Sequence, residues 1–199
     1  MDDEKYGVIQ KMTKDLARAG RYKVESDAIS VLNNAFTTNG YDGVPLVSAS
    51  HPLANSTKKA SNLITGALSD VALKNALTLG RKQLDEAGKI IQMKFDTLVV
   101  PPALEFLAQE LIKSTGKPGG DLNDINVLHN KFTVKVNDFL TSDTAWFLMD
   151  SKRHQLNFFW RVKPEFGKEK DFDSLVTKWA GYMRYSYGYS DFRGIIGST

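Results

Sequence analysis

The sequence predicts an α+β fold made of one long helix, a small mixed lobe and a long late strand. Apolar residues recur at steps of three and four over residues 6–36, which indicates one face of a helix. Short apolar runs between turn residues follow over 69–163. In the segment 175–189 one residue parity is mostly aromatic or apolar, which is typical of a strand. Together these three patterns indicate segregated helices and strands.

The first helix is predicted over residues 6–36 and ends at Asn39-Gly40. At about 1.5 Å per residue it would be roughly 45 Å long. A core of 199 residues does not require a helix of that length. One long surface helix is the simpler interpretation, and an architectural beam is the more specific one.

Residues 40–68 are rich in Gly, Ser, Asn and Pro, which predicts an ordered loop with at most short strands. A second helix is predicted to begin at a Ser69 or Asp70 cap and to end at Gly88, because glycine suits a helix C-terminus. Residues 89–100 predict one or two strands, the last being a buried run at its end.

Two prolines at 101–102 break that strand, and the second fits the first turn of a third helix that stops at Gly116. Residues 114–131 predict a long polar loop. Short strands are then predicted at residues 132–136, 145–149 and 158–162.

Composition excludes several kinds of chemistry. The chain has no cysteine, which removes disulfides, thiolate metal sites and cysteine nucleophiles. Acidic and basic residues alternate and leave a net charge of only +3, so charge alone indicates no partner. No apolar run approaches the roughly 20 residues of a membrane helix, and the charged start is unlike a signal peptide. We therefore expect a soluble chain without a membrane partner.

Candidate catalytic groups are few. His51, His129 and His154 lack metal-ligand spacing, so no metal and no cofactor is predicted. No GxSxG turn is present, and a hydrolase acting through His51 or His129 stays a minor hypothesis. The pair His51-Pro52 instead favours a turn. The glycine-rich residues 116–120 place proline where a phosphate-binding loop needs an amide.

The C-terminal segment supports an alternative function. Its aromatic and basic residues could form a stacking platform for single-stranded nucleic acid. Alternating aromatics are equally what a half-buried strand prefers, and packing is the favoured interpretation. The residues concerned are Lys178, Trp179, Tyr182, Arg184, Tyr185, Tyr187, Tyr189 and Arg193.

Three stretches occur in a fixed order along the chain: GYDG at 40–43 leading to SHPL at 50–53, LVVPPALE at 98–105 continuing to Leu111, and residues 123–128 followed by 140–148. In order and spacing, from about residue 6 to residue 194, they resemble the Mu-like family of tailed-phage major head (capsid) proteins. The resemblance covers nearly the whole chain.

The resemblance implies the Hong Kong 97-type phage capsid fold. Residues 1–68 would form a peripheral lobe with its spine helix and the following loop. Residues 69–163 would form a mixed α/β axial lobe, and 164–199 would return as a long C-terminal strand to the peripheral lobe. Family members carry an N-terminal arm and an extended loop before the spine helix. This sequence begins almost at that helix and is expected to lack both.

The function implied by the resemblance is structural, not enzymatic. The chain would be a subunit of an icosahedral phage or prophage-derived head, joining copies of itself in hexamers and pentamers by head-to-tail edge contacts. The shell would enclose double-stranded DNA without reading its sequence, and scaffold and portal proteins are possible partners. Assembly would take place in the host bacterial cytoplasm, and the product would be the virion capsid.

The loop at 116–131 is the predicted subunit interface around a symmetry axis, because long ordered loops are often functional. The alternative is simple surface disorder. The residues predicted to contact neighbouring subunits are Lys117, Asp121, Asn123, Asp124, Asn126 and His129.

Overall fold

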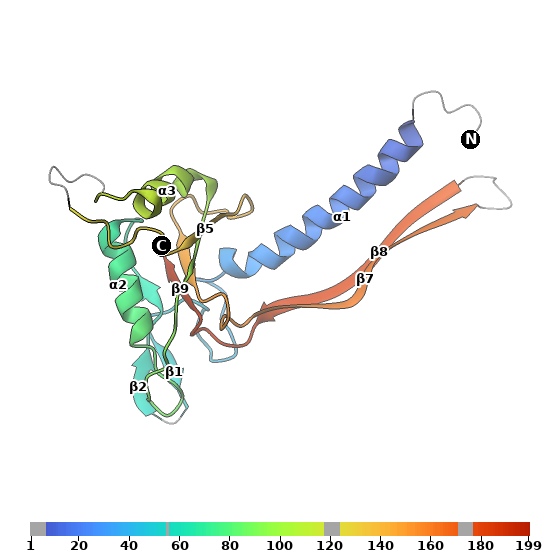
Figure 1. Cartoon of the computed structure of the whole chain (residues 1–199). Helices are drawn as coiled ribbons and strands as arrows, with labels where there is room; N and C mark the ends of the chain where they lie inside the picture. The colour runs from blue at the N-terminus through green and yellow to red at the C-terminus, as the bar shows by residue number, and fades with distance from the viewer. Residues whose placement is uncertain (1–6, 55, 118–123, 171–176) are drawn as a thin grey trace. The chain divides into compact units, whose positions relative to one another are not determined.

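The computed structural model describes residues 7–54, 56–117, 124–170 and 177–199 (Figure 1). The chain divides into two compact units. Unit 1 consists of residues Met1–Ile29 and Asn157–Gly188, and unit 2 consists of Ser30–Leu156 and Tyr189–Thr199. This division falls at other places than the lobe boundaries predicted at residues 68 and 163, and the lobes themselves stay a prediction.

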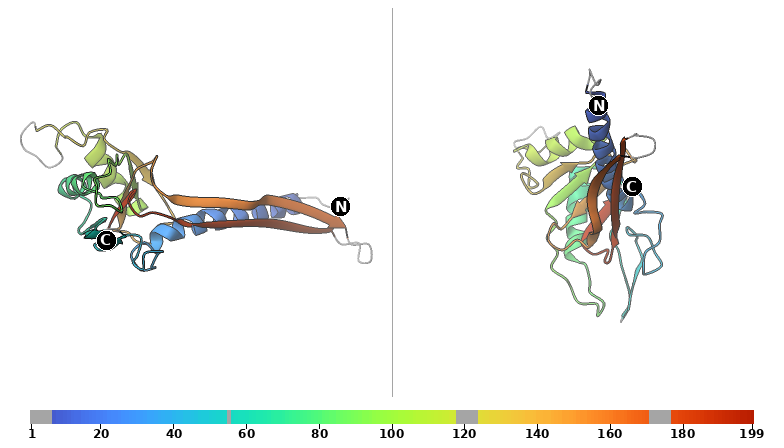
Figure 2. Two further views of the ribbon diagram at one scale, coloured as in Figure 1. Left: turned by 90° about the horizontal axis from the view of Figure 1, so that it is seen from below. Right: turned by 90° about the vertical axis from the view of Figure 1, so that its right-hand side faces the viewer.

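Unit 1 contains most of the long helix and a two-stranded ribbon. Helix α1 spans Val8–Asn33, close to the predicted 6–36. Strands β7 (Leu156–Lys170) and β8 (Thr177–Tyr189) pair only with each other, and the ribbon runs alongside the helix (Figure 2). The late strand is thus confirmed.

Strand β7 corrects the sequence prediction, which placed a strand only at residues 158–162. Its second half is rich in charged residues and was therefore not recognised as a strand. A strand with an exposed face tolerates such residues, because only the side chains on the covered face need to be apolar.

Unit 2 is built on a five-stranded mixed sheet in the order β3-β9-β6-β4-β5. Strands β4 and β5 are parallel, as are β3 and β9, whereas β6 is antiparallel to both of its neighbours. The predicted strands at 97–100, 132–136 and 145–149 are confirmed. The strand bounds are Leu63–Ile64 for β3, Thr97–Val100 for β4, Thr133–Val136 for β5, Trp146–Met149 for β6 and Ile195–Ser198 for β9.

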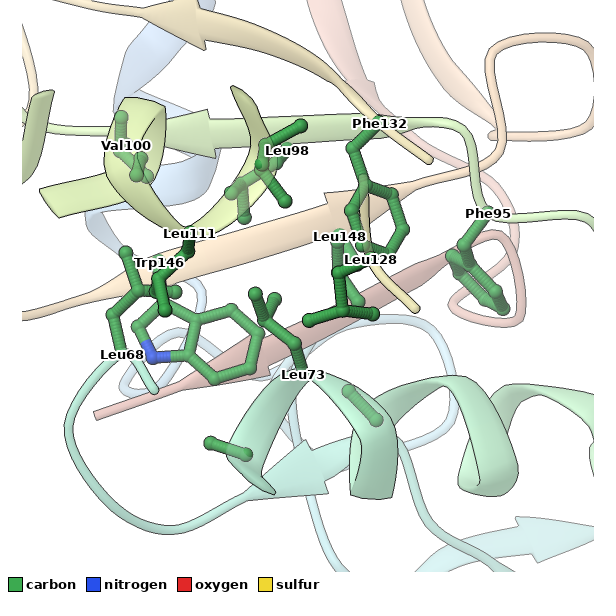
Figure 3. Close-up of a cluster of buried hydrophobic side chains, with 14 of the residues drawn as sticks. Leu68, Leu73, Phe95, Leu98, Val100, Leu111, Leu128, Phe132, Trp146 and Leu148 are labelled. Atoms are coloured by element: carbon green, nitrogen blue, oxygen red, sulfur yellow. The ribbon is translucent and has the colours of Figure 1, made fainter. Parts of the chain in front are cut away.

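The main core lies on one face of this sheet. Leu98, Leu148 and Ile196 stand opposite one another on three adjacent strands and are fully buried. They pack with the apolar sides of two helices, as Leu73 and Leu111 illustrate (Figure 3). Strands β4, β6 and β9 are buried on both faces, which explains their continuous apolar runs.

Helix α2 spans Asp70–Arg81, and the Ser69 side chain caps it by accepting a hydrogen bond from the Ala72 amide, as predicted. The predicted end at Gly88 is wrong. Gly88 instead has a φ of 76° and lies in a turn in which its amide donates to the Asp85 carbonyl oxygen. Helix α2 ends earlier, at Arg81.

The third helix begins at the second proline, as predicted, with a short 3-10 turn η1 (Pro102–Leu104) that leads into α3 (Glu105–Lys113). It ends at Lys113 with Ser114 as its C-cap, before the predicted Gly116. The predicted short strands within 40–68 are the hairpin β1 (His51–Leu53) and β2 (Ser56–Ala60), together with β3.

Strand β9 was not predicted as a separate strand. Its residues were assigned to the C-terminal strand that returns to the peripheral lobe, but they form an interior strand of the unit 2 sheet, between β3 and β6. Gly197 lies opposite Phe147 in this ladder, and a Cβ at position 197 would come within 3.1 Å of the Phe147 ring. The glycine therefore makes room for the aromatic ring.

Gly194, just before β9, provides a test of this packing. A Cβ at position 194 would stand 2.6 Å from the His154 Cα and 2.9 Å from the Arg153 carbonyl oxygen, which are backbone atoms. We expect Gly194→Ala to lower the free energy of unfolding by about 1–3 kcal/mol, measured by urea titration. Gly188→Ala is the control, because nothing lies within 4 Å of its added Cβ. Equal stability of the two variants would contradict the packing described.

Candidate interaction surfaces

The loop after α3 is held in place by the side chain of Asn126. Its Nδ2 atom donates to the carbonyl oxygens of Leu111 (2.8 Å) and Ser114 (2.9 Å), and its Oδ1 atom accepts from the Leu128 amide. The two carbonyls belong to the last turn of the helix, where backbone acceptors lack partners within the helix. Asn126 therefore both caps the helix and fixes the course of the loop.

The predicted interface residues are placed differently from one another. Lys117, Asp124 and His129 are exposed, and the Lys117 amide donates to the Asp124 carbonyl, which brings both ends of the loop together. Asn126 is only 5% exposed, so it anchors the loop and offers no contact surface. Asp121 and Asn123 lie outside the described residues. The interface itself stays a prediction.

Apolar side chains on the same loop point to solvent, a feature that sequence reasoning did not single out. Ile125 is 83% exposed and Val127 is 64% exposed, on either side of the buried Asn126. On α3, Phe106 is 76% exposed. No signal in the sequence marks this surface, because apolar residues at 125 and 127 that alternate with a polar residue at 126 favour burial of the apolar ones.

His51 is buried in unit 2 and lies in strand β1, not in the predicted turn. Its Nδ1 atom lies 2.6 Å from Oδ2 of Asp42, and its Nε2 atom lies 3.1 Å from Oδ1 of Asn62. The ring also stacks on Phe192 at 3.6 Å between centroids. Both ring nitrogens are engaged, so neither remains for a serine hydroxyl or a metal ion. The hydrolase hypothesis gains no support from this geometry.

Asn62 connects His51 to the rest of the unit. Its Nδ2 atom donates to the carbonyl oxygens of Leu46 and Ile195, and its Oδ1 atom accepts from the Ser48 amide. These contacts fix which end of the Asn62 amide faces His51. Asp42 and Asn62, the partners of His51, were not identified from the sequence.

Removing His51 should therefore be costly. His51→Ala leaves the Asp42 carboxylate buried without its partner, and we expect the free energy of unfolding to fall by about 3–5 kcal/mol. Thermal or urea denaturation measures the loss. His129→Ala is the control, because its side chain is exposed and should change stability by less than about 0.5 kcal/mol. Similar losses in the two variants would count against a structural role for His51.

Arg193 belongs to the aromatic and basic set of the alternative hypothesis, but it is 5% exposed. Its guanidinium binds Glu86 (2.5 Å), Asp191 (2.9 Å) and the Leu84 carbonyl oxygen (2.7 Å). The hydrogen bond from the Ala54 amide is the main cause that keeps the pKa of the Glu86 carboxyl below its ordinary value, and the hydrogen bond from Arg193 is the second. Arg193 is thus a structural cation within unit 2.

Three aromatic residues of the ribbon in unit 1 pack on one another, whereas five others on the two strands are 39–64% exposed: Phe159, Phe166, Trp179, Tyr182 and Tyr187. Phe158, Trp160 and Tyr185 contact one another with ring centroids 5.1–5.4 Å apart. The Tyr185 hydroxyl donates to Asp27 of α1 at 2.7 Å. A mostly apolar groove of about 310 Å³ separates the helix and ribbon near Leu16 and Met183. Packing, the favoured interpretation, therefore agrees with the contacts of Tyr185, whereas Trp179, Tyr182 and Tyr187 of the alternative set are exposed.

The Tyr185–Asp27 contact predicts sensitivity to alkaline pH. Burial is the largest cause that raises the pKa of the Tyr185 hydroxyl from 10 to about 12, and the hydrogen bond to Asp27 is the next. A group whose pKa is higher in the folded state stabilises fully below its unfolded pKa, and this contribution is lost as pH rises through the folded value. We expect unit 1 to lose stability between pH 10 and about pH 12.

Urea denaturation followed by tryptophan fluorescence over this pH range measures the effect. Tyr185→Phe should flatten that part of the pH dependence. Tyr182→Phe is the matched control, because Tyr182 is 55% exposed, and it should leave the dependence unchanged. If the Tyr185→Phe variant still loses the same stability between pH 10 and about pH 12, the Tyr185–Asp27 contact is not the cause of the pH dependence.

Among the described residues, no three His, Asp or Glu side chains lie close enough together to hold a metal ion. Among the helices of the same part of the chain, none is both long and apolar enough to span a membrane.

The comparison with protein families is decisive for identity. The family model described as "Phage capsid protein" matches residues 1–198. This chain belongs to that phage capsid protein family. The capsid resemblance inferred from the ordered motifs is therefore confirmed.

The comparison with solved structures gives a more distant similarity. A crystal structure of a virus-like particle from Pyrococcus furiosus is similar at a TM-score of 0.40 and 10% sequence identity. The alignment covers 69% of this chain and 56% of the virus-like particle chain. This chain therefore spans little more than half the length of that protein. The comparison with curated proteins found no match.

Proposed function

We propose that this chain is a structural subunit of an icosahedral phage or prophage-derived head. Copies would join by edge contacts into hexamers and pentamers, with the Hong Kong 97-type subunit fold. The shell would enclose double-stranded DNA without sequence specificity. Scaffold and portal proteins would be its assembly partners, with assembly in the host bacterial cytoplasm and the virion as its final location.

The observation that carries this proposal is the family match over residues 1–198, which is almost the full sequence. The α+β organisation supports it, because the long helix with its ribbon and the separate sheet unit correspond to the elements that the capsid resemblance implies. In this scheme α1 is the spine helix. The mixed sheet with α2 and α3 forms the axial lobe.

The loop after α3 is the proposed contact with neighbouring subunits. Stable protein interfaces combine an apolar centre with a polar rim. Ile125 and Val127 provide apolar side chains that are mostly exposed, and Lys117, Asp124 and His129 provide polar groups nearby on the loop. The bonds of Asn126 fix the chain beside Ile125 and Val127 before any partner arrives, which limits the entropy that these residues lose on association.

Assembly is tested directly by light scattering of the purified chain at rising concentration, with negative-stain images of any large species. The expected result is a concentration-dependent rise in mass with rings, sheets or shells in the images. A constant mass of 22.2 kDa at every concentration would contradict self-assembly of this chain.

A charge on the loop should block this assembly. We expect Ile125→Glu to raise the concentration needed for assembly by at least about tenfold, because a buried unpaired carboxylate in the contact costs more than about 1.4 kcal/mol. Val71→Glu is the matched control, because Val71 is 64% exposed on α2 and lies outside the loop. Circular dichroism checks that both variants fold. Unchanged assembly of the Ile125→Glu variant would remove the loop from the interface.

A further inference from the structure

The ribbon β7–β8 has two faces of different chemistry. Side chains alternate between the faces along each strand. Trp160 and Tyr185 mark the covered face, because their rings contact each other and the Tyr185 hydroxyl binds Asp27 of α1. Residues of the opposite parity in each strand therefore point away from the helix.

The outward parity carries four basic residues, together with two acidic residues, Glu165 and Glu169, toward the end of β7. Arg161 and Lys163 occupy it on β7, and Lys178 and Arg184 occupy it on β8. All four are exposed. In the described part of the chain, Arg161, Lys163 and Arg184 make no ion pair with a carboxylate.

The cations of α1 are arranged differently, although the helix belongs to the same unit. Arg18 pairs with Asp15 at 3.5 Å, Arg21 with Glu25 at 2.8 Å, and Lys23 with Asp27 at 2.6 Å. Each pair lies within one helical turn and offsets its own charge. The charges of Arg18, Arg21 and Lys23 are therefore offset locally on the helix, whereas Arg161, Lys163 and Arg184 on the outward face of the ribbon have no such carboxylate partner in the described residues.

This face suits a polyanion better than a protein. The centre of a protein interface is depleted of charged residues, whereas here Arg161, Lys163 and Arg184 occupy the middle of the surface. Surfaces that bind nucleic acid are polar and strongly positive. Double-stranded DNA carries one negative charge per about 1.7 Å of its axis, so it offers phosphates along any extended basic surface.

We propose that the outward face of β7–β8 binds the phosphate backbone of double-stranded DNA. The inference rests on the proposed function, in which the shell encloses that DNA, and it names the surface that touches it. The contact is electrostatic and independent of base sequence. Many copies in a shell would multiply contacts that are individually weak.

The test uses the full chain and two 30-base-pair duplexes of unrelated sequence, with binding measured by fluorescence anisotropy between 50 and 200 mM salt. The ribbon variant carries Arg161→Gln and Lys163→Gln. The control variant carries Arg18→Gln and Arg21→Gln, which removes the same charge from α1, where both side chains are 82% exposed. Circular dichroism checks that both variants fold.

The wild-type chain should bind both duplexes equally. Each phosphate contact contributes about 0.9 to the slope of log affinity against log salt. The ribbon variant should therefore lose about 2 from that slope and bind both duplexes equally less well. The control variant should lose less than 1. Equal losses in the two variants, a difference between the duplexes, or no binding by the wild type would each overturn the inference.

Light scattering of the same variants separates this inference from the proposed function. A ribbon variant that assembles normally but has lost the salt-dependent binding supports the DNA-contacting face. A ribbon variant that no longer assembles but keeps its DNA affinity places a neighbouring subunit on this face, which overturns the inference while the shell function stands. Failure of the wild type to assemble would contradict the proposed function, whatever the DNA measurement gives.

Discussion

The hydrogen bonds of Asn62 are the interaction on which unit 2 depends. The residue lies between β2 and β3, and its side chain donates to the backbone carbonyls of Leu46 before β1, of Phe192 before β9 and of Ile195 at the start of β9. Its own carbonyl accepts from the Gly197 amide, inside β9. One buried amide thus connects early and late parts of the chain. An apolar residue of the same size would leave several buried backbone groups without partners, and each such loss is costly.

The ribbon illustrates how one strand alternation can meet two requirements. Toward the helix, aromatic rings and one tyrosine hydroxyl form the small core of unit 1. Toward solvent, the same strands carry basic residues that also discourage pairing with further strands, since charged side chains protect sheet surfaces and edges from aggregation. Of the aromatic residues that could suggest nucleic-acid stacking, Tyr185 is therefore occupied inside the unit, whereas Trp179, Tyr182 and Tyr187 are exposed.

Patterns confined to a short window predicted much of the fold. The apolar steps of α1, the buried runs of β4 and β6 and the alternation of β8 each lie within one element. The end of α2 was missed because Gly88 fits a helix end and a positive-φ turn equally well. Strand β9 was missed because four residues carry too little pattern to be assigned to a distant sheet.

The polar sites were harder to predict, for a physical reason. Asp42 and Asn62 lie 9 and 11 residues from His51, and only the folded loops bring the three side chains together. At the described ends of the loop at 116–131, backbone hydrogen bonds join Lys117 to Asp124 and Thr115 to Asn126. Its anchoring residue, Asn126, could not be distinguished from its exposed neighbours, because polar residues of a loop look alike until their hydrogen bonds are known.

The position of β9 also bears on the order of events during synthesis. The ribosome makes β3, β4, β5 and β6 long before residues 195–198, yet β9 must insert between β3 and β6. Until then, β3 has no partner strand and one edge of β6 is unpaired. Contacts between residues so far apart in sequence form slowly. A subunit whose sheet closes last is held back from its final surface until the late strand has been made, which separates synthesis in time from association with other copies.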